Sequence, residues 1–170
     1  MNKETLLDKF LVKFFSIPAI KNYWARHYKA LEFTDIPWKK LEKPIEESKI
    51  VLITTGGIHL KSDKKFNLSD PNGDSTFRRI PYDTSLNDLI ITHKYYDHHD
   101  ADRDPNLILP MDILTELQSE GIVGPSCKYH YSFMGHIKEP HITSLIQKNS
   151  VEAAKEIRQQ KVDIALLVPA

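Results

Sequence analysis

The chain has 170 residues, 41% of them hydrophobic, and its 23 Lys and Arg residues balance 23 Asp and Glu residues. This composition indicates a globular domain rather than a disordered chain, and the balanced charge removes the electrostatic argument for a nucleic-acid or membrane partner. The single cysteine, Cys127, excludes an intrachain disulfide framework, a paired-thiol redox motif and a cysteine-rich zinc site.

The N-terminal part of the sequence predicts two helices. Apolar residues recur at helical spacing over 4–15, and a second helix is expected over 19–31. Prolines favour an extended segment over 33–48. We therefore expect an N-terminal helical segment, residues 1–32, followed by an α/β domain, residues 33–170. A signal-peptide pattern and an apolar run of roughly 20 residues are both missing, so we expect a cytoplasmic protein.

A buried strand that runs into a glycine turn is the most informative feature of the sequence. The apolar run Ile50–Ile53 is typical of a strand covered on both faces. Gly56 and Gly57 allow a sharp turn or the close approach of a ligand. Thr55 and His59 would bring hydrogen-bonding groups to the carboxyl end of this strand, where ligands collect in open α/β sheets. The alternative is an ordinary strand that ends in an ordinary turn.

The middle of the chain alternates turn signals with short apolar runs. Residues 56–75 are expected to form a long loop, and strands are expected over 76–80 and 89–92. Pro110 suits the start of a helix that Gly121 would end. Residues 122–137 are expected to be irregular.

The C-terminal part predicts a helix and a second buried strand. Ser150 is expected to cap a helix over 151–161, and the apolar run over 162–168 predicts the strand. We expect a three-layer, Rossmann-like α/β domain with a mainly parallel sheet, in which the strands near 50–55 and 162–168 are central.

Two clusters of polar residues are candidates for chemistry. The first, residues 92–104, is rich in His and Asp; it could bind a divalent metal, form a solvated loop, or line a substrate pocket with His93 and Asp97 as acid–base groups. It matches no established metal-ligand spacing. The second, residues 128–136, places aromatic and polar groups before a glycine, as in a pocket lining or in ordinary loop packing.

Several blocks in this order resemble the selenoprotein B family of glycine, sarcosine, betaine and D-proline reductases. The similarity runs from about Pro37 to Ala170. The blocks that carry the resemblance are Thr54–Leu60, Asp70–Arg78, Ile91–His93, Tyr96–Asp97, Asp100–Asn106 and His130–His136.

The resemblance implies an oxidoreductase that reductively cleaves a carbon–nitrogen bond, with dithiols as the eventual electron donor. It implies a partner subunit whose pyruvoyl group activates a small amine or amino-acid substrate, and a thiol or selenol carrier protein. It also implies a nucleophilic selenocysteine, or a cysteine in some relatives, shortly after a strand like 162–168.

This sequence departs from the family pattern at the expected nucleophile, because it ends at Ala170. Cys127 does not occupy that position, and we expect no cofactor in this chain. One hypothesis is a UGA codon read as a stop; a split gene or a genuine short paralogue are alternatives. The competing functions are a non-catalytic binding or assembly module and a His/Asp metal protein.

The site residues expected from this reasoning fall into two groups. His93 or His59 would donate a proton to the leaving amine, and the planar guanidinium of Arg103 would bind a carboxylate. No metal ligand is predicted. The expected catalytic residues are His59, His93 and Asp97, and the expected substrate-binding residues are Thr55, Gly56, Gly57, Asp102, Arg103, His130, Ser132 and His136.

Overall fold

The computed structural model describes residues 10, 14, 17–27 and 39–170. The chain divides into two compact units, one of residues 1–40 with 94–97 and the other of residues 41–93 with 98–170. The first unit contains helix α2, Pro18–His27, where a helix over 19–31 was expected. Most of the predicted helix 4–15 and the expected domain boundary after residue 32 lie outside the described residues.

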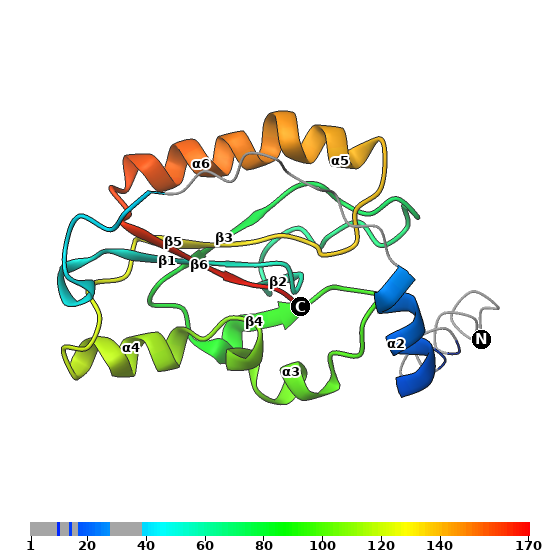
Figure 1. The fold of residues 1–170 in the computed structure, drawn as a ribbon, viewed down its shortest axis with the longest axis horizontal. Coiled ribbons are helices and arrows are strands. Elements are labelled where there is room, and N and C mark those ends of the chain that lie inside the picture. The colour runs from blue at the N-terminus through cyan, green and yellow to red at the C-terminus, as the bar shows by residue number, and fades with distance from the viewer. Residues whose placement is uncertain (1–9, 11–13, 15–16, 28–38) are drawn as a thin grey trace. The chain divides into compact units, whose positions relative to one another are not determined.

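The second unit is built on a four-stranded sheet (Figure 1). Strands β1 (Ile50–Thr54), β5 (Tyr129–Ser132) and β6 (Ile164–Val168) are parallel, and β3 (Arg78–Pro81) pairs antiparallel with β5. The strand order is β3-β5-β1-β6. The predicted α/β class with a mainly parallel sheet is therefore confirmed.

Helices cover both faces of this sheet, because β1 is apolar on both sides. Leu52 belongs to a core cluster with Leu114 of α4 (Met111–Ser119). Val51, the next residue along and therefore on the opposite face, packs with Ala153 of α6 (Ser150–Gln159). Figure 1 shows α6 above the sheet and α4 below it. This is the layering that an all-apolar parallel strand requires.

Short elements complete the second unit. Strands β2 (Ile58–Leu60) and β4 (Leu89–Ile91) form a separate antiparallel pair. A continuous helical stretch leads into α6 through α5 (His141–Ser144) and a π-helical turn. The other helices are α3 (His99–Arg103) and 3-10 turns at Ile45–Glu47, Leu86–Asp88 and Pro105–Leu107. Among the described residues, every helix is too short or too polar to cross a membrane.

Four expectations about these elements were wrong. Residues 122–137 contain strand β5, which pairs with β1 and β3. Strand β6 lies at the edge of the sheet rather than in its centre. Ser150 does not cap α6, because the helical stretch already runs through it and its hydroxyl donates to the Ile146 carbonyl at 3.1 Å. The predicted loop 56–75 also contains β2.

Candidate functional site

The carboxyl ends of the three parallel strands meet at one edge of the sheet. The N–H of Phe133, just after β5, donates to Thr54 O at 2.9 Å, and the N–H of Thr55 donates to Val168 O of β6 at 3.2 Å. The N–H of Ala170 donates to Thr55 Oγ1 at 3.1 Å. We call this junction the strand-end site; it comprises Thr55, Gly56, Gly57, His93, Ser132, Gly135 and Ala170.

Gly57 is required by the tight turn after β1. Its φ is +67°, and a Cβ at this position would lie 2.8 Å from Thr92 O and 3.3 Å from the Cβ of His93. The N–H of Gly57 donates to Phe133 O, and its carbonyl accepts from the N–H of Thr92, both at 2.9 Å. Only glycine combines this left-handed backbone with so close an approach. The turn therefore fixes His93 beside the strand ends.

Gly135 lets the backbone after β5 approach Thr55, Ala170 and His93 closely. A Cβ on Gly135 would lie 3.1 Å from Thr55 O, 3.5 Å from Ala170 O and 3.5 Å from His93 Nε2. The imidazole nitrogen, two backbone carbonyls and this glycine thus face one small region. This is the kind of place where a small polar ligand can reach the end of a parallel sheet.

His93 is a neutral imidazole at neutral pH. Its side chain is 9% exposed, and burial lowers its pKa to about 4, with smaller contributions from the nearby positive charges of His136 and His98. A neutral imidazole accepts or donates a hydrogen bond, whereas proton donation to a leaving group is the work of the imidazolium. An anionic neighbour would raise this pKa.

Ser132 adds a buried hydroxyl beneath the junction. It is fully buried and pairs with Thr54 across the two parallel strands. Within the described residues, its Oγ makes no hydrogen bond. A buried hydroxyl without a hydrogen-bond partner destabilises a fold by about 1–3 kcal/mol. A water molecule or a polar ligand group that bonds to it would therefore be stabilised there.

The structure places His59 in the core. Its Nδ1 lies 2.7 Å from Leu60 O and its Nε2 lies 2.8 Å from Thr92 Oγ1, and the ring is fully buried. This pattern fits a neutral ring whose Nδ1–H donates to the carbonyl while Nε2 accepts the Thr92 hydroxyl. Both nitrogens are thus used to hold β2 beside Thr92, and the geometry favours a structural role for His59.

His130 also lies inside the sheet rather than at the strand ends. Its Nδ1 accepts the N–H of Leu52 in the middle of β1 at 3.1 Å, and burial lowers its pKa to about 4. The Sγ of Cys127 lies 3.7 Å from the same nitrogen. The imidazole therefore satisfies a backbone donor that the strand ladder leaves open.

The other predicted site residues lie in α3 and in loops. His136 is half-buried, its Nε2 lies 3.3 Å from Pro71 O, and burial lowers its pKa. Asp102 accepts from His98 within α3 at 2.7 Å, and Arg103, the last residue of α3, is exposed. Asp97 is an exposed residue of the other compact unit. The proposed roles of Asp97, Asp102 and Arg103 stay predictions.

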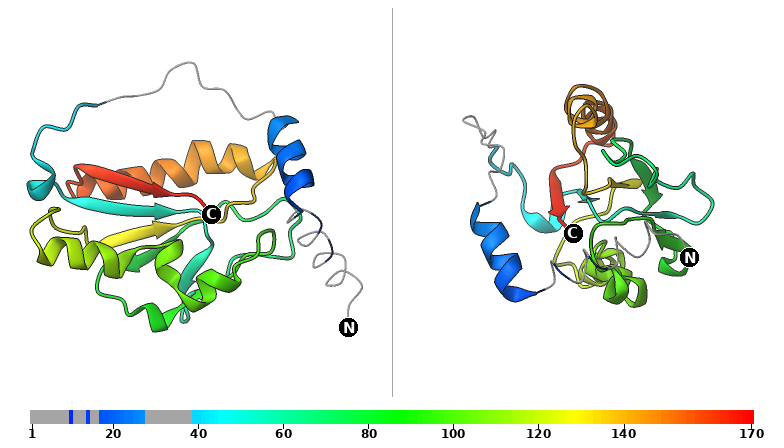
Figure 2. Two further views of the ribbon diagram at one scale, coloured as in Figure 1. Left: turned by 60° about the horizontal axis from the view of Figure 1, so that its bottom comes forward. Right: turned by 90° about the vertical axis from the view of Figure 1, so that its right-hand side faces the viewer.

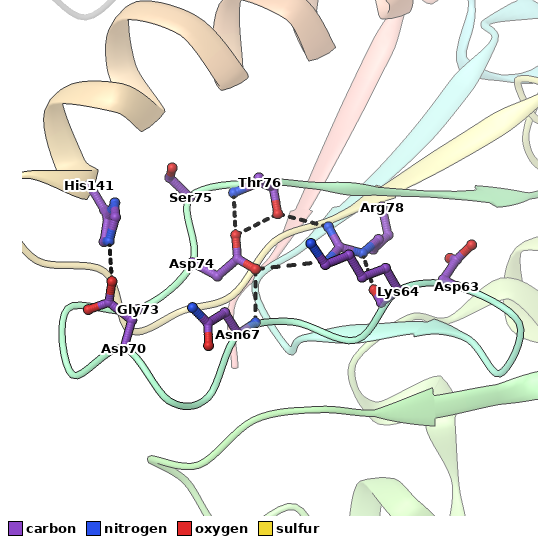
Figure 3. Close-up of a pocket in the computed structure, with 10 residues that line it drawn as sticks. All are labelled: Asp63, Lys64, Asn67, Asp70, Gly73, Asp74, Ser75, Thr76, Arg78 and His141. Atoms are coloured by element: carbon purple, nitrogen blue, oxygen red, sulfur yellow. Dashed lines mark hydrogen bonds and ion pairs between the residues drawn. The ribbon is translucent and has the colours of Figure 1, made fainter.

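A hollow of about 580 Å³ lies in the loop before β3 (Figure 3). Arg78 organises this loop: its guanidinium donates to the Lys64 and Lys65 carbonyls at 2.8 and 3.2 Å and lies 4.2 Å from the Phe66 ring centre. It also donates to Thr76 Oγ1 at 2.9 Å. Figure 3 shows Arg78 turned toward Thr76 and Asp74, so Arg78 serves the loop rather than a ligand.

The sequence reasoning did not single out Gly135, although a glycine before a histidine near a strand end could have signalled a close approach. In the part of the chain that the structure describes, His, Cys, Asp and Glu side chains form no group of three or more that could hold a metal ion. The metal-site alternative for residues 92–104 therefore gains no support there.

The chain matches the family model described as glycine/sarcosine/betaine reductase selenoprotein B over residues 19–170. The chain belongs to this selenoprotein B family. It is 33% identical to D-proline reductase subunit gamma of Acetoanaerobium sticklandii over 130 residues, which cover 76% of this chain and 52% of that relative.

Other relatives are components of related reductase complexes. The chain is 26% identical to glycine reductase complex component B subunit gamma of Symbiobacterium thermophilum, over 85% of this chain and 33% of the relative. It is 27% identical to sarcosine reductase complex component B subunit beta of Peptoclostridium acidaminophilum, over 61% of this chain and 24% of the relative. The chain thus spans about half the length, or less, of these relatives. No solved structure matches it.

Proposed function

We propose that the chain is a B-type component of an amino-acid reductase complex that reductively cleaves a carbon–nitrogen bond. The observation that carries the proposal is the strand-end site in a selenoprotein B family member, where Gly57 and Gly135 keep side chains away from His93. Ligands of open α/β sheets bind at this edge. A small amine or amino acid is the expected substrate.

The proposed reaction replaces the carbon–nitrogen bond with one carbon–hydrogen and one nitrogen–hydrogen bond. A dithiol supplies the two electrons and two protons and becomes a disulfide, so atoms and electrons balance. By analogy with the family, a selenocysteine or cysteine is the nucleophile, and a pyruvoyl group on a partner subunit activates the substrate. A thiol or selenol carrier protein is the further expected partner.

Cys127 is not suited to be this nucleophile. It is 1% exposed, its Sγ lies 2.8 Å from Tyr129 O, and burial raises its pKa to about 11. The reactive form of a cysteine is the thiolate, which this thiol does not form at neutral pH. The nucleophile is therefore expected from polypeptide that meets the strand-end site, and His93 is the proton-transfer group that this chain contributes.

A non-catalytic binding or assembly module is the second candidate function. The state of Cys127 favours it, because a buried thiol with a raised pKa gives the isolated chain no reactive sulfur. In this case the strand-end site would bind substrate or a partner without changing a bond.

The deciding experiment uses the tagged chain, expressed in its native host and purified with the reductase subunits that accompany it. Dithiol oxidation is measured with glycine, sarcosine, betaine or D-proline as substrate. We expect one of these substrates to drive oxidation, and His93→Gln to lower kcat by roughly 10²–10⁴-fold, the usual contribution of a positioned acid–base group.

His99→Gln is the matched control, because His99 begins α3 and is exposed. It should leave kcat unchanged. Reductase activity that survives His93→Gln removes His93 from the chemistry. A purified complex that oxidises dithiol with none of the four substrates, yet binds one of them, supports the binding module instead.

A further inference from the structure

The backbone of residues 136–138 is held by a turn in the loop before β3. The N–H of Lys138 donates to Asn72 O at 2.8 Å. Gly73 has φ +88°, and a Cβ at this position would collide with the carbonyl of His136. Because only glycine combines this backbone conformation with so close an approach, the turn and the segment pack backbone against backbone.

Asp70 joins this turn to the start of α5. Its Oδ1 accepts the Asn72 N–H at 2.9 Å, and its backbone carbonyl accepts the Gly73 N–H at 3.1 Å, which closes the turn. Its Oδ2 lies 2.8 Å from Nε2 of His141, the first residue of α5. Figure 3 shows the His141 ring pointing at this carboxylate, and Figure 2 gives further views of α5 beside the loop. The bonds from His141 and Asn72 hold the pKa of Asp70 below its usual range, so its carboxylate is ionised and accepts both at neutral pH.

The held segment follows directly on the strand-end site. The Nε2 of His136 lies 3.3 Å from Pro71 O, so this ring is tied to the turn as well. Gly135, one residue earlier, is the position whose Cβ would lie 3.5 Å from His93 Nε2. His136 is also close enough to His93 for its charge to lower the pKa of that imidazole. A shift of the 136–138 backbone would therefore change the surroundings of His93.

We infer that Asp70 is a positioning residue for the strand-end site. It acts through the turn and through His141, which together hold the 136–138 backbone. That backbone keeps Gly135 beside His93. The inference rests on the proposed function, in which His93 is the proton-transfer group. Proton transfer depends on exact placement, and a misplacement of about 1 Å can lower a rate by roughly a hundredfold.

The test follows the titration of the His93 imidazole by NMR in the full chain, with its signal assigned by its loss in His93→Gln. The pKa of His93 is about 4, because the ring is buried and lies near His136 and His98. In Asp70→Ala the released segment should uncover the ring, and this pKa should rise by at least roughly one pH unit toward its ordinary value. His141→Ala removes the same contact from its other side and should give the same rise.

Two control variants separate positioning from a general loss of stability. Asp70→Asn keeps an acceptor oxygen for the turn and a hydrogen-bonding group for His141, so it should leave the pKa of His93 unchanged. Asp63→Ala changes another carboxylate that lines the same hollow and accepts the Leu60 N–H at 3.3 Å; it should also leave that pKa unchanged. Circular dichroism reports whether each variant folds, and if Asp70→Ala does not fold, the His141→Ala titration decides.

Activity of the purified reductase complex gives an independent readout. Asp70→Ala should lower kcat at least roughly tenfold and leave KM within about twofold, because the reacting groups are misplaced while substrate still binds.

The two readouts together separate the inference from the proposed function. An unchanged pKa of His93 in the folded Asp70→Ala and His141→Ala variants overturns the inference, and so does an equal rise in Asp63→Ala. Reductase activity that is the same in Asp70→Ala as in the wild type also overturns it. A rise in the pKa of His93, in a complex that oxidises dithiol with none of the substrates, keeps the positioning of His93 and removes the proposed function. An active complex in which this pKa does not rise has the opposite meaning.

Discussion

The turn after β1 makes a quantitative prediction, because two glycines of this chain share a backbone conformation but differ in their surroundings. Gly57 has φ +67° with Thr92 O only 2.8 Å from an added Cβ, whereas Gly121 has φ +71° with nothing within 4 Å. Alanine at Gly121 therefore measures the left-handed backbone alone, and alanine at Gly57 adds the contacts with Thr92 and His93.

The left-handed conformation costs an alanine about 1–2 kcal/mol. Forcing a methyl group against fixed backbone adds about 1–3 kcal/mol, because Thr92 and the end of β4 must move. The free energy of unfolding should therefore fall by about 1–2 kcal/mol in Gly121→Ala and by about 2–5 kcal/mol in Gly57→Ala. The smaller conformational freedom of the unfolded alanine chain acts equally on both variants.

Urea unfolding followed by circular dichroism gives both free energies, and the difference between the two variants isolates the close approach. Equal losses at the two positions would refute the reasoning, since the contact between Gly57 and Thr92 would then carry no energy. A loss confined to Gly57→Ala would show instead that the left-handed backbone costs nothing here.

Two further predictions concern the core and the loop. Burial lowers the pKa of His93 and of His130 to about 4. Between pH 6.5 and 4 the unfolded chain therefore binds more protons than the folded chain. As the pH falls through that window, the free energy of unfolding should fall by up to about 3 kcal/mol per histidine. His130→Gln, whose amide oxygen can still accept the Leu52 N–H, should flatten this pH dependence; an unchanged slope contradicts the assignment. Arg78→Lys should raise the rate of amide hydrogen exchange in residues 61–77, because lysine cannot make the set of hydrogen bonds that holds the loop carbonyls. The control is Arg79→Lys, the neighbouring substitution in β3. Exchange in Arg78→Lys that is as slow as in this control would contradict the prediction.

The sequence predicted β1 and the turn that follows it because both depend on local chemistry. Four consecutive apolar residues need cover on both faces, and only glycine fits the backbone at Gly57. Strand β6 was predicted for the same reason, but its place at the edge was not. Apolar composition shows that a strand needs cover, and it does not show where in the sheet the strand lies.

The sequence did not predict strand β5, where polar side chains are buried by partners distant in the chain. Strand β5 reads Tyr-His-Tyr-Ser, and its inward histidine meets the Leu52 N–H from 78 residues away. His59 is held in the same way, since its Nε2 lies 2.8 Å from the hydroxyl of Thr92, 33 residues on. A histidine near a glycine turn has the same sequence signature whether it meets solvent, substrate or a hydroxyl of the core.

The protonation state of His93 depends on what lies beside its imidazole in the strand-end site. Its pKa of about 4 reflects burial and two neighbouring histidines, so in this chain alone the imidazole is neutral at neutral pH. A selenolate, a thiolate or a substrate carboxylate beside Nε2 would favour the imidazolium and raise that pKa. An anion bound beside this imidazole would therefore itself create the proton donor.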